Sequence, residues 1–403
     1  MICTNRKSNQ INTGLLTKEF GTILTDRQTD RQTDRQTDRQ TDRKKERKKE
    51  RNIYLDIVKC FTIFLVIWGH VVQQSLDPDI YPEQADGIYR LIYTFHMPLF
   101  MGISGYFFGK SVCKTGGAYS YFQKKLEKRI LGLVIPMLSF GVISYLVQLF
   151  WGMSESPLSI LQHVHSIWFL GDLVIYTFVV LAVSFLCNQN FSHDWKYLLA
   201  GVIFTCIPQV GYGFRGPFFY LYYITGYCAA LYLTNFQIMS MRKYGKITIT
   251  AFLLIYILYS NLPWPFEHFQ ANWHNFSFIR IGTVISLKII LGFIGSYVAL
   301  FLIYQIYLKL QSTWLFRQAG RMGAYTLDIY LIQMILVERI LGPVYRQWVG
   351  ISGIDYLHTY GLFAEFIVTF FLATVLVEII SWISRLVNRN PELARILFYR
   401  KII

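Results

Sequence analysis

The chain of 403 residues is 53% hydrophobic and 17% aromatic, whereas only 16% of its residues are charged. A mean hydropathy of +0.35 lies above the range of soluble domains, so the sequence predicts an all-α protein whose solvent is lipid. The formal net charge of +15 resides mainly in polar loops and terminal segments, where cations fix topology or contact anionic lipid. Nucleic acid is therefore excluded as a partner. Six scattered cysteines predict neither a disulfide framework nor a metal site.

Two short repeats dominate residues 1–51, which we expect to be disordered because they contain few apolar side chains. Residues 25–43 repeat Thr-Asp-Arg-Gln, and residues 44–51 repeat Lys-Lys-Glu-Arg. The tetranucleotides ACAG and GAAA, read continuously, encode these two repeats. One interpretation is a slippage-prone tract in the gene, in which gain or loss of one unit shifts the reading frame. The alternative is a start site placed too far upstream.

The rest of the chain alternates between apolar and polar segments, and a transmembrane helix needs roughly 20 mostly apolar residues. About ten such helices are predicted, at residues 54–74, 88–109, 130–151, 167–187, 197–212, 216–233, 247–261, 281–308, 322–341 and 361–384. Basic residues are concentrated in every second loop, as expected if these loops face the cytoplasm. This pattern predicts that both termini are cytoplasmic. We thus predict a membrane domain at residues 52–386, a cytoplasmic tail at residues 387–403, and residence in the bacterial inner membrane.

The first predicted helix carries three ionisable side chains, and ionisable groups within a membrane indicate function. Lys59 precedes His70 by eleven positions, and eleven steps of about 100° bring both to one stripe, separated by about 16 Å. Asp56 lies one turn before Lys59 and can pair with it or hold it in place. His96, in the descending second helix, reaches a depth similar to that of His70. A cation near the cytoplasm can bind phosphates, and a deeper neutral imidazole can remove a hydroxyl proton.

Five ordered motifs give the chain a resemblance to the acyltransferase-3 family, from about residue 52 to the end. The first is Lys59, ten further residues and His70, similar to that family's Arg-or-Lys and His signature. The others are Phe95–Phe100 with Ile103–Tyr106 in the second helix, Phe122–Lys125 with Arg129 and Pro136 before and within the third, Ile167–Leu170 at the start of the fourth, and Gly323–Ile332 near the end. The chain differs from many relatives in having Gln333 in place of a histidine. We also expect it to end after the tenth predicted helix, without the esterase-like domain that some relatives carry.

The resemblance implies transfer of an acyl group, most often acetyl from cytoplasmic acetyl-CoA, to a hydroxyl of a cell-envelope glycan. No tightly bound cofactor is implied, and the expected partners are acyl-CoA, a glycan or lipid-linked sugar, and membrane lipids. We expect His70 to be the general base and His96 to orient it or to donate to the developing oxyanion. We expect Lys59, Lys125 and Arg129 to engage the phosphates of CoA, and Ser104 to line the same cavity as the two histidines.

Each of these residues also fits an ordinary structural role. Lys59 can be a lysine that extends from the helix end to the headgroups, and Lys125 and Arg129 can be topology-determining charges. Asp56 fits a structural role better than a catalytic one. Packing or interface roles suit Ser104 and Trp168. Lys288 is predicted to lie within a membrane helix and has no assigned role; Asp172 and Glu338 are candidate partners between which the sequence does not choose.

Two other functions are compatible with a helical membrane protein that contains buried charges. A transporter or flippase of a lipid-linked saccharide would use many helices and aromatic side chains, but the chain lacks clear inverted repeats and paired broken helices. A scaffold without catalytic activity in a polysaccharide synthesis complex would make the polar stripe incidental. The sequence favours the enzyme.

Overall fold

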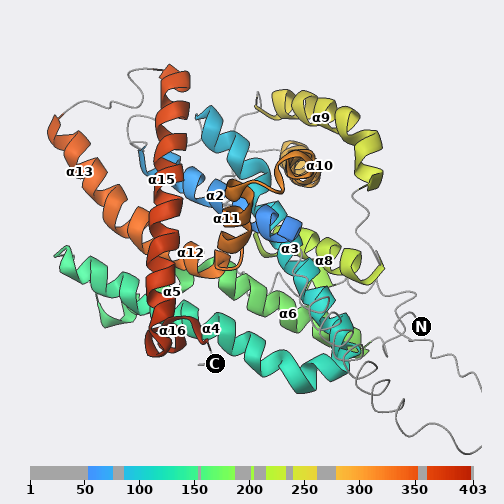
Figure 1. Ribbon diagram of the computed structural model, residues 1–403, viewed down its shortest axis with the longest axis horizontal. Helices are drawn as coiled ribbons and strands as arrows, with labels where there is room; N and C mark the ends of the chain where they lie inside the picture. The colour runs from blue at the N-terminus through green and yellow to red at the C-terminus, as the bar shows by residue number, and fades with distance from the viewer. Residues whose placement is uncertain are drawn as a thin grey trace, which may run out of the picture. The chain divides into compact units, whose positions relative to one another are not determined.

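The computed structural model describes residues 53–75, 86–152, 156–186, 201–203, 215–232, 239–260, 278–352 and 361–400. Throughout these ranges the regular structure is helical and no strand occurs, which confirms the predicted all-α class (Figure 1). The predicted disordered segment at residues 1–51 lies outside the described residues. So does most of the fifth predicted helix, of which residues 201–203 are described.

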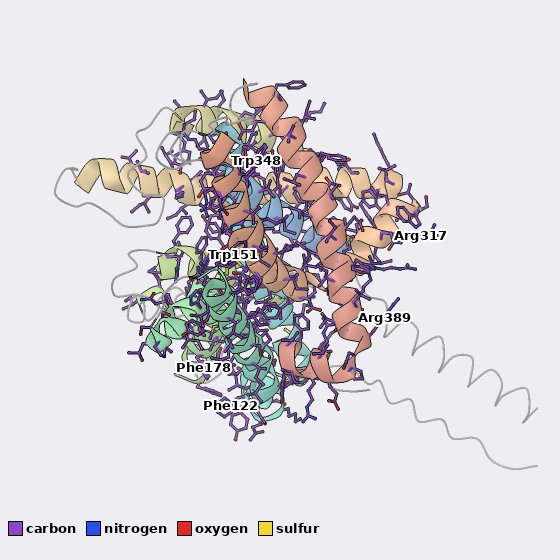
Figure 2. All side chains as sticks on the ribbon, turned by 90° about the vertical axis from the view of Figure 1, so that its left-hand side faces the viewer. Phe122, Trp151, Phe178, Arg317, Trp348 and Arg389 are labelled. Carbon is purple, nitrogen blue, oxygen red and sulfur yellow. The ribbon has the colours of Figure 1, made fainter. Side chains whose placement is uncertain are left out.

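Six described helices are long and apolar enough to cross a membrane. They are α2 (Ile53–Ser75), α3 (Gly87–Thr115), α4 (Ala118–Phe150), α6 (Trp168–Leu186), α10 (Phe278–Leu310) and α15 (Gly361–Arg389). The predicted count of ten is not reached by the described residues. Figure 2 shows Phe122 on α4 and Phe178 on α6, which are 47% and 48% exposed. Large apolar side chains at such positions fit a protein surface that contacts lipid.

The remaining helices are shorter or more polar. They are α5 (Ile160–Ser166) with the 3-10 turn η2 (Pro157–Ser159) before it, α8 (Arg215–Tyr232), α9 (Met239–Ser260), α11 (Trp314–Met322), α12 (Thr326–Gln333), the π-helix η6 (Met334–Leu341), α13 (Gly342–Ser352) and α16 (Pro391–Phe398). The predicted single helix at 322–341 is therefore divided into α12 and η6. Helix α12 begins at Thr326 and not at the predicted residue 322, because α11 ends at Met322 and a turn separates α11 from α12.

Helix α3 has clear signals at both ends. Asp86 caps its first turn by accepting a hydrogen bond from the Tyr89 backbone N–H at 2.6 Å. Gly116 ends it with φ of +89°, a conformation that glycine adopts without steric cost. Its most extensive contact is with α8. Glycines permit this contact, because a Cβ built on Gly105 or Gly226 would overlap backbone atoms of the facing helix.

Helix α2 is buried along most of its length and contacts helices that are distant in the sequence. The Tyr54 hydroxyl donates to the Leu300 carbonyl of α10 at 2.8 Å. The Trp68 indole N–H donates to the hydroxyl of Thr369 on α15 at 3.0 Å. Because both ends of α2 are fixed in this way, side chains projecting from it have defined positions.

The segment predicted as a cytoplasmic tail, residues 387–403, includes the last turn of α15 and all of α16. Helix α16 contacts α4 and α15 (Figure 1). Arg400, just after α16, forms an ion pair with both carboxylate oxygens of Asp328 on α12 at 2.9 Å. Asn388 on α15 donates to the same carboxylate at 2.8 Å. These contacts join three elements from the last third of the chain.

Candidate active site

The first part of the site is the cation that α2 presents near its N-terminal end. The Lys59 ammonium lies 2.6 Å from the Asp56 carboxylate, one turn earlier, as the predicted pairing requires. It also lies 4.7 Å from the centre of the Phe107 ring on α3. A cation over an aromatic face is stabilised electrostatically. The side chain of Lys59 remains 20% exposed at this end of the helix.

The second part of the site is His70, near the other end of α2. Its Nδ1 atom lies 3.1 Å from Oε1 of Glu338 and 3.2 Å from Oε1 of Gln73. Both neighbours are acceptor oxygens, so Nδ1 carries the proton and Nε2 keeps its lone pair in the neutral ring. A histidine whose Nδ1 lies beside an amide oxygen and a carboxylate, with Nε2 as the unprotonated nitrogen, has the arrangement of a general base.

His96 joins this site through two neighbouring polar side chains. Gln73 Oε1, which lies against His70, also accepts a hydrogen bond from the Tyr93 hydroxyl at 3.2 Å. The Tyr93 ring in turn packs edge-on to the His96 imidazole, with ring centres 4.6 Å apart. Helix α3 can approach α2 here because Gly69 has no side chain: a Cβ there would lie 2.9 Å from a Tyr93 ring carbon.

The tautomer of His96 decides between its two predicted roles. Its Nδ1 lies 2.7 Å from the backbone carbonyl of Ile92, which only accepts hydrogen bonds, so Nδ1 carries the proton. Nε2 is then an acceptor in the neutral ring. The side chain is also buried, at 2% exposure. This geometry fits the orienting role better than donation to an oxyanion.

Glu338 is a neighbour of His70 that the sequence did not connect with the candidate site. It was recognisable as an acid within a membrane helix, but no pattern linked it to His70 because the two residues lie far apart in the chain. Its place on the π-helix η6 explains how it arrives there. A π turn rotates the following side chains relative to a continuous α-helix, and such turns occur frequently at functional sites. The ninth predicted helix thus contributes a carboxylate, although it carries Gln333 where many relatives have histidine.

The other predicted binding residues lie elsewhere on α3 and α4. Arg129 donates to the Thr177 hydroxyl at 2.9 Å and to the Tyr223 hydroxyl at 3.2 Å, within the helix bundle. Lys125 is exposed on the first turns of α4. The Ser104 hydroxyl donates to a carbonyl of its own helix at 2.8 Å. The structure therefore gathers His70 and His96 but not the whole predicted set.

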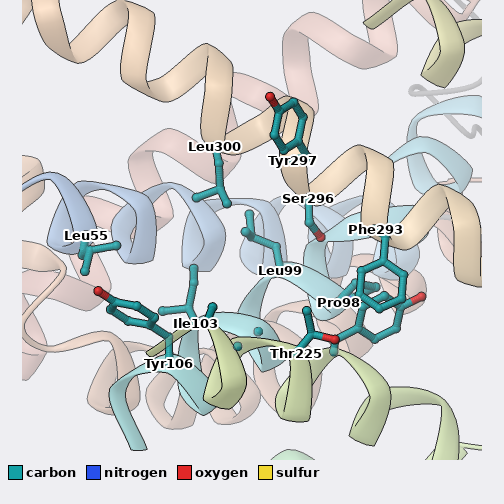
Figure 3. Close-up of a pocket in the computed structure, with 14 residues that line it drawn as sticks. Leu55, Pro98, Leu99, Ile103, Tyr106, Thr225, Phe293, Ser296, Tyr297 and Leu300 are labelled. Atoms are coloured by element: carbon teal, nitrogen blue, oxygen red, sulfur yellow. The ribbon is translucent and has the colours of Figure 1, made fainter. Parts of the chain in front are cut away.

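An apolar cavity of about 250 Å³ lies beside this part of the bundle, between α2, α3, α8 and α10 (Figure 3). Figure 3 shows Leu99 and Ile103 of α3 facing Leu300 of α10. Ser104, which was expected to line a cavity, is not among its lining residues. The lining is almost entirely apolar, and neither histidine belongs to it. The acid–base groups of the site are therefore separate from this cavity.

Comparison with known proteins places the site within a recognised domain. A family model described as an acyltransferase domain, that of the acyltransferase-3 family, matches residues 52–385. Nodulation protein NolL of Sinorhizobium fredii (strain NBRC 101917 / NGR234) is 28% identical over 163 residues, which are 39% of this chain and 42% of that protein. Nodulation protein NolL of Mesorhizobium japonicum (strain LMG 29417 / CECT 9101 / MAFF 303099) is 32% identical over 87 residues, 22% of each chain.

These alignments span less than half the length of either curated relative. No solved structure is significantly similar to the chain. The family model, in contrast, covers α2 through most of α15 and includes Lys59, His70, His96 and Glu338. By this match the protein belongs to the acyltransferase-3 family.

Proposed function

We propose that the protein is a membrane-embedded acyltransferase that moves an acetyl group from acetyl-CoA to a hydroxyl of a cell-surface glycan. The observation that carries this proposal is the position of His70, whose Nδ1 lies 3.2 Å from Oε1 of Gln73 and 3.1 Å from Oε1 of Glu338. Its Nε2 is the basic atom that deprotonation of an alcohol requires. Family membership supports the reaction class.

In the proposed reaction, the acceptor hydroxyl loses its proton to Nε2 of His70 as its oxygen attacks the thioester carbonyl. Glu338 stabilises the imidazolium that forms, as a carboxylate does in other histidine-based sites. The tetrahedral intermediate collapses by breaking the carbon–sulfur bond. The proton then passes from His70 to the CoA thiolate, so the base is regenerated and the products are CoA and an ester.

The donor is proposed to bind from the end of α2 where Lys59 lies. Under the predicted topology this end faces the cytoplasm, which contains acetyl-CoA, so the bacterial inner membrane is the expected location. Lys59 would bind the donor phosphates. These phosphates would replace Asp56 as the ionic partner of the ammonium. Lys125, exposed near the start of α4, is free of the contacts that hold Arg129 inside the bundle and suits a second phosphate contact better.

The direct test uses membranes from cells that produce the full chain, [14C]acetyl-CoA, and surface polysaccharide from which esters have been removed with mild alkali. We expect radiolabel in the polysaccharide with the wild type and loss of at least about 100-fold in His70→Ala. Glu392→Gln on exposed α16 serves as a control and should retain activity. Equal labelling by wild type and His70→Ala, at matched protein levels, would contradict the proposal.

A further inference from the structure

A second, polar cavity of about 280 Å³ lies between α4, α5, α6 and the start of α8. Among the residues that the structure describes, its polar lining is His165, Trp168, Asp172 and Arg215, and its apolar lining includes Met137 and Leu161. A pocket with apolar walls and a few convergent polar groups is the usual form of a small-molecule site. None of these residues takes part in the acid–base chemistry proposed above.

The charges in this cavity compensate each other. Arg215 Nε lies 3.8 Å from Oδ2 of Asp172, and the guanidinium lies 4.9 Å from the centre of the Trp168 ring. Burial, with a smaller effect from Arg215, lowers the pKa of His165, so this imidazole is neutral at pH 7. The lining residues described thus contribute one cation and one anion. A neutral ligand is favoured over an anionic one, because an anion would compete with Asp172 for Arg215.

The polar groups suit a ligand that both donates and accepts hydrogen bonds. The guanidinium only donates, the carboxylate only accepts, and a neutral imidazole does both. The apolar side chains of Met137 and Leu161 can pack against the C–H groups of a ligand. A sugar ring combines hydroxyls with apolar C–H faces. It is smaller than the drug-sized ligands that occupy pockets of roughly 300–1,000 Å³, so a cavity of this size suits one ring.

The cavity is linked to the site around His70 through Tyr330 of α12. The Tyr330 hydroxyl interacts electrostatically with Glu338 and also with Asp172 and Arg215. Its ring packs against Phe169, next to Trp168 at the start of α6, with ring centres 5.4 Å apart. In the predicted topology the start of α6 faces away from the cytoplasm, opposite the donor end.

We propose that this cavity is the acceptor subsite, in which Arg215, Asp172 and His165 bind one neutral sugar residue of the glycan while a hydroxyl of that glycan reaches His70. The inference rests on the proposed function and adds to it the place and the charge of the acceptor. A sugar ring must fit into the cavity for this proposal to hold. A side chain that fills the cavity should therefore block binding, and the test uses this consequence.

Gly171 offers a way to fill the cavity without disturbing its polar groups. It lines the cavity, and a Cβ built on it meets only the Met137 sulfur at 4.0 Å, an ordinary contact. Gly171→Leu should therefore fold and occupy the space of the ligand, whereas Gly171→Ala should leave most of it open. Gly132→Leu is the matched control, because a Cβ on this α4 glycine meets nothing within 4 Å and Gly132 does not line the cavity.

The binding experiment uses the full chain in lipid nanodiscs and saturation-transfer-difference NMR. The probe is the mixture of methyl glycosides released by methanolysis of the producing organism's surface polysaccharide. We expect transfer to the C–H protons of a neutral methyl glycoside with wild type, Gly171→Ala and Gly132→Leu, and at least fivefold weaker transfer with Gly171→Leu. The same signal in Gly171→Leu, no signal with wild type, or a signal confined to acidic glycosides would each overturn the proposal.

Kinetics separate this inference from the proposed function. In the acetyl-transfer assay, Gly171→Leu should raise the KM for polysaccharide at least tenfold and leave the KM for acetyl-CoA within twofold of wild type. If wild type transfers acetyl and Gly171→Leu has an unchanged acceptor KM, the subsite is wrong and the function stands. If wild type transfers nothing, the function fails, and the NMR experiment still decides whether the cavity binds a sugar.

Discussion

At the scale of single residues, the position of His70 follows from sequence spacing, but its chemistry depends on its neighbours. The eleven-residue interval from Lys59 predicts that both side chains lie along one helix, and the structure places them near opposite ends of α2. The interval does not determine which nitrogen of His70 is basic. That property comes from Gln73, one turn away on the same helix, and from Glu338, far along the chain.

Replacing Glu338 tests the catalytic importance of this contact. Glu338→Gln keeps the shape of the side chain but removes the charge that stabilises the imidazolium, so we expect kcat to fall by about 100-fold with little change in either KM. The measurement is steady-state acetyl transfer by the purified protein. Glu392→Gln, the same substitution on exposed α16, should retain kcat. A kcat of Glu338→Gln within twofold of wild type would show that this carboxylate does not support His70.

Replacing Lys59 tests donor binding. A charge-assisted hydrogen bond contributes roughly 1.5–3 kcal/mol, so Lys59→Ala should raise the KM for acetyl-CoA about 10- to 100-fold. Lys124→Ala removes an equivalent charge from an exposed position on α4 and should change this KM less than twofold. Dephospho-acetyl-CoA should narrow the difference between wild type and Lys59→Ala if the lysine contacts the 3′-phosphate. An equal donor KM in both lysine variants would refute the assignment.

At the scale of elements, the close contact between α3 and α8 holds the helix that carries Tyr93 and His96. Gly226→Ala would introduce a Cβ that overlaps the Gly102 carbonyl, so the helices must separate. Overpacking of this kind costs roughly 1–3 kcal/mol. We expect a Tm lower by several degrees in detergent, measured by tryptophan fluorescence during heating.

The control for this packing prediction is Gly132→Ala. No atom lies within 4 Å of a Cβ at Gly132, and alanine stabilises a helix relative to glycine by about 1 kcal/mol. Its Tm should equal or exceed that of wild type. If Gly226→Ala and Gly132→Ala behaved alike, the contact between α3 and α8 would not depend on the absence of a side chain.

At the scale of the whole molecule, the Arg400–Asp328 ion pair fastens the end of the chain to α12. Asp328 is 1% exposed, so Arg400→Gln leaves a buried carboxylate that has lost its cation and keeps the hydrogen bonds from Ser384 and Asn388. Removing one member of a fully buried pair costs roughly 3–5 kcal/mol. Arg400 is partly exposed, so we expect a cost of about 2 kcal/mol, seen as a lower Tm and faster chymotrypsin cleavage near the C-terminus.

Arg389→Gln is the matched control for this prediction, because Arg389 is exposed at the end of α15 and projects outward in Figure 2. This substitution should leave Tm and the cleavage rate near C-terminal residues unchanged. A stability of Arg400→Gln equal to that of Arg389→Gln would mean that the ion pair does not hold α16 in place.

Local composition and spacing were sufficient to predict the long apolar helices and one ion pair. Long apolar runs require helices in lipid, because only intrahelical hydrogen bonds satisfy the backbone there, and α2, α3, α4, α6, α10 and α15 follow from this. The pairing of Asp56 with Lys59 is likewise a local consequence of helix geometry. The positions of both termini relative to the membrane stay predictions.

Contacts between side chains that are far apart in the sequence could be identified only from the packing of the helices. A continuous helix was predicted where α12 and the π-helix η6 lie, because hydrophobicity does not record a change in hydrogen-bond register. Likewise, no periodicity brings Glu338 to His70, or Arg215 to Asp172. Such contacts arise from helix packing, whose geometry depends on side-chain shape across the bundle rather than on the order of residues along one helix.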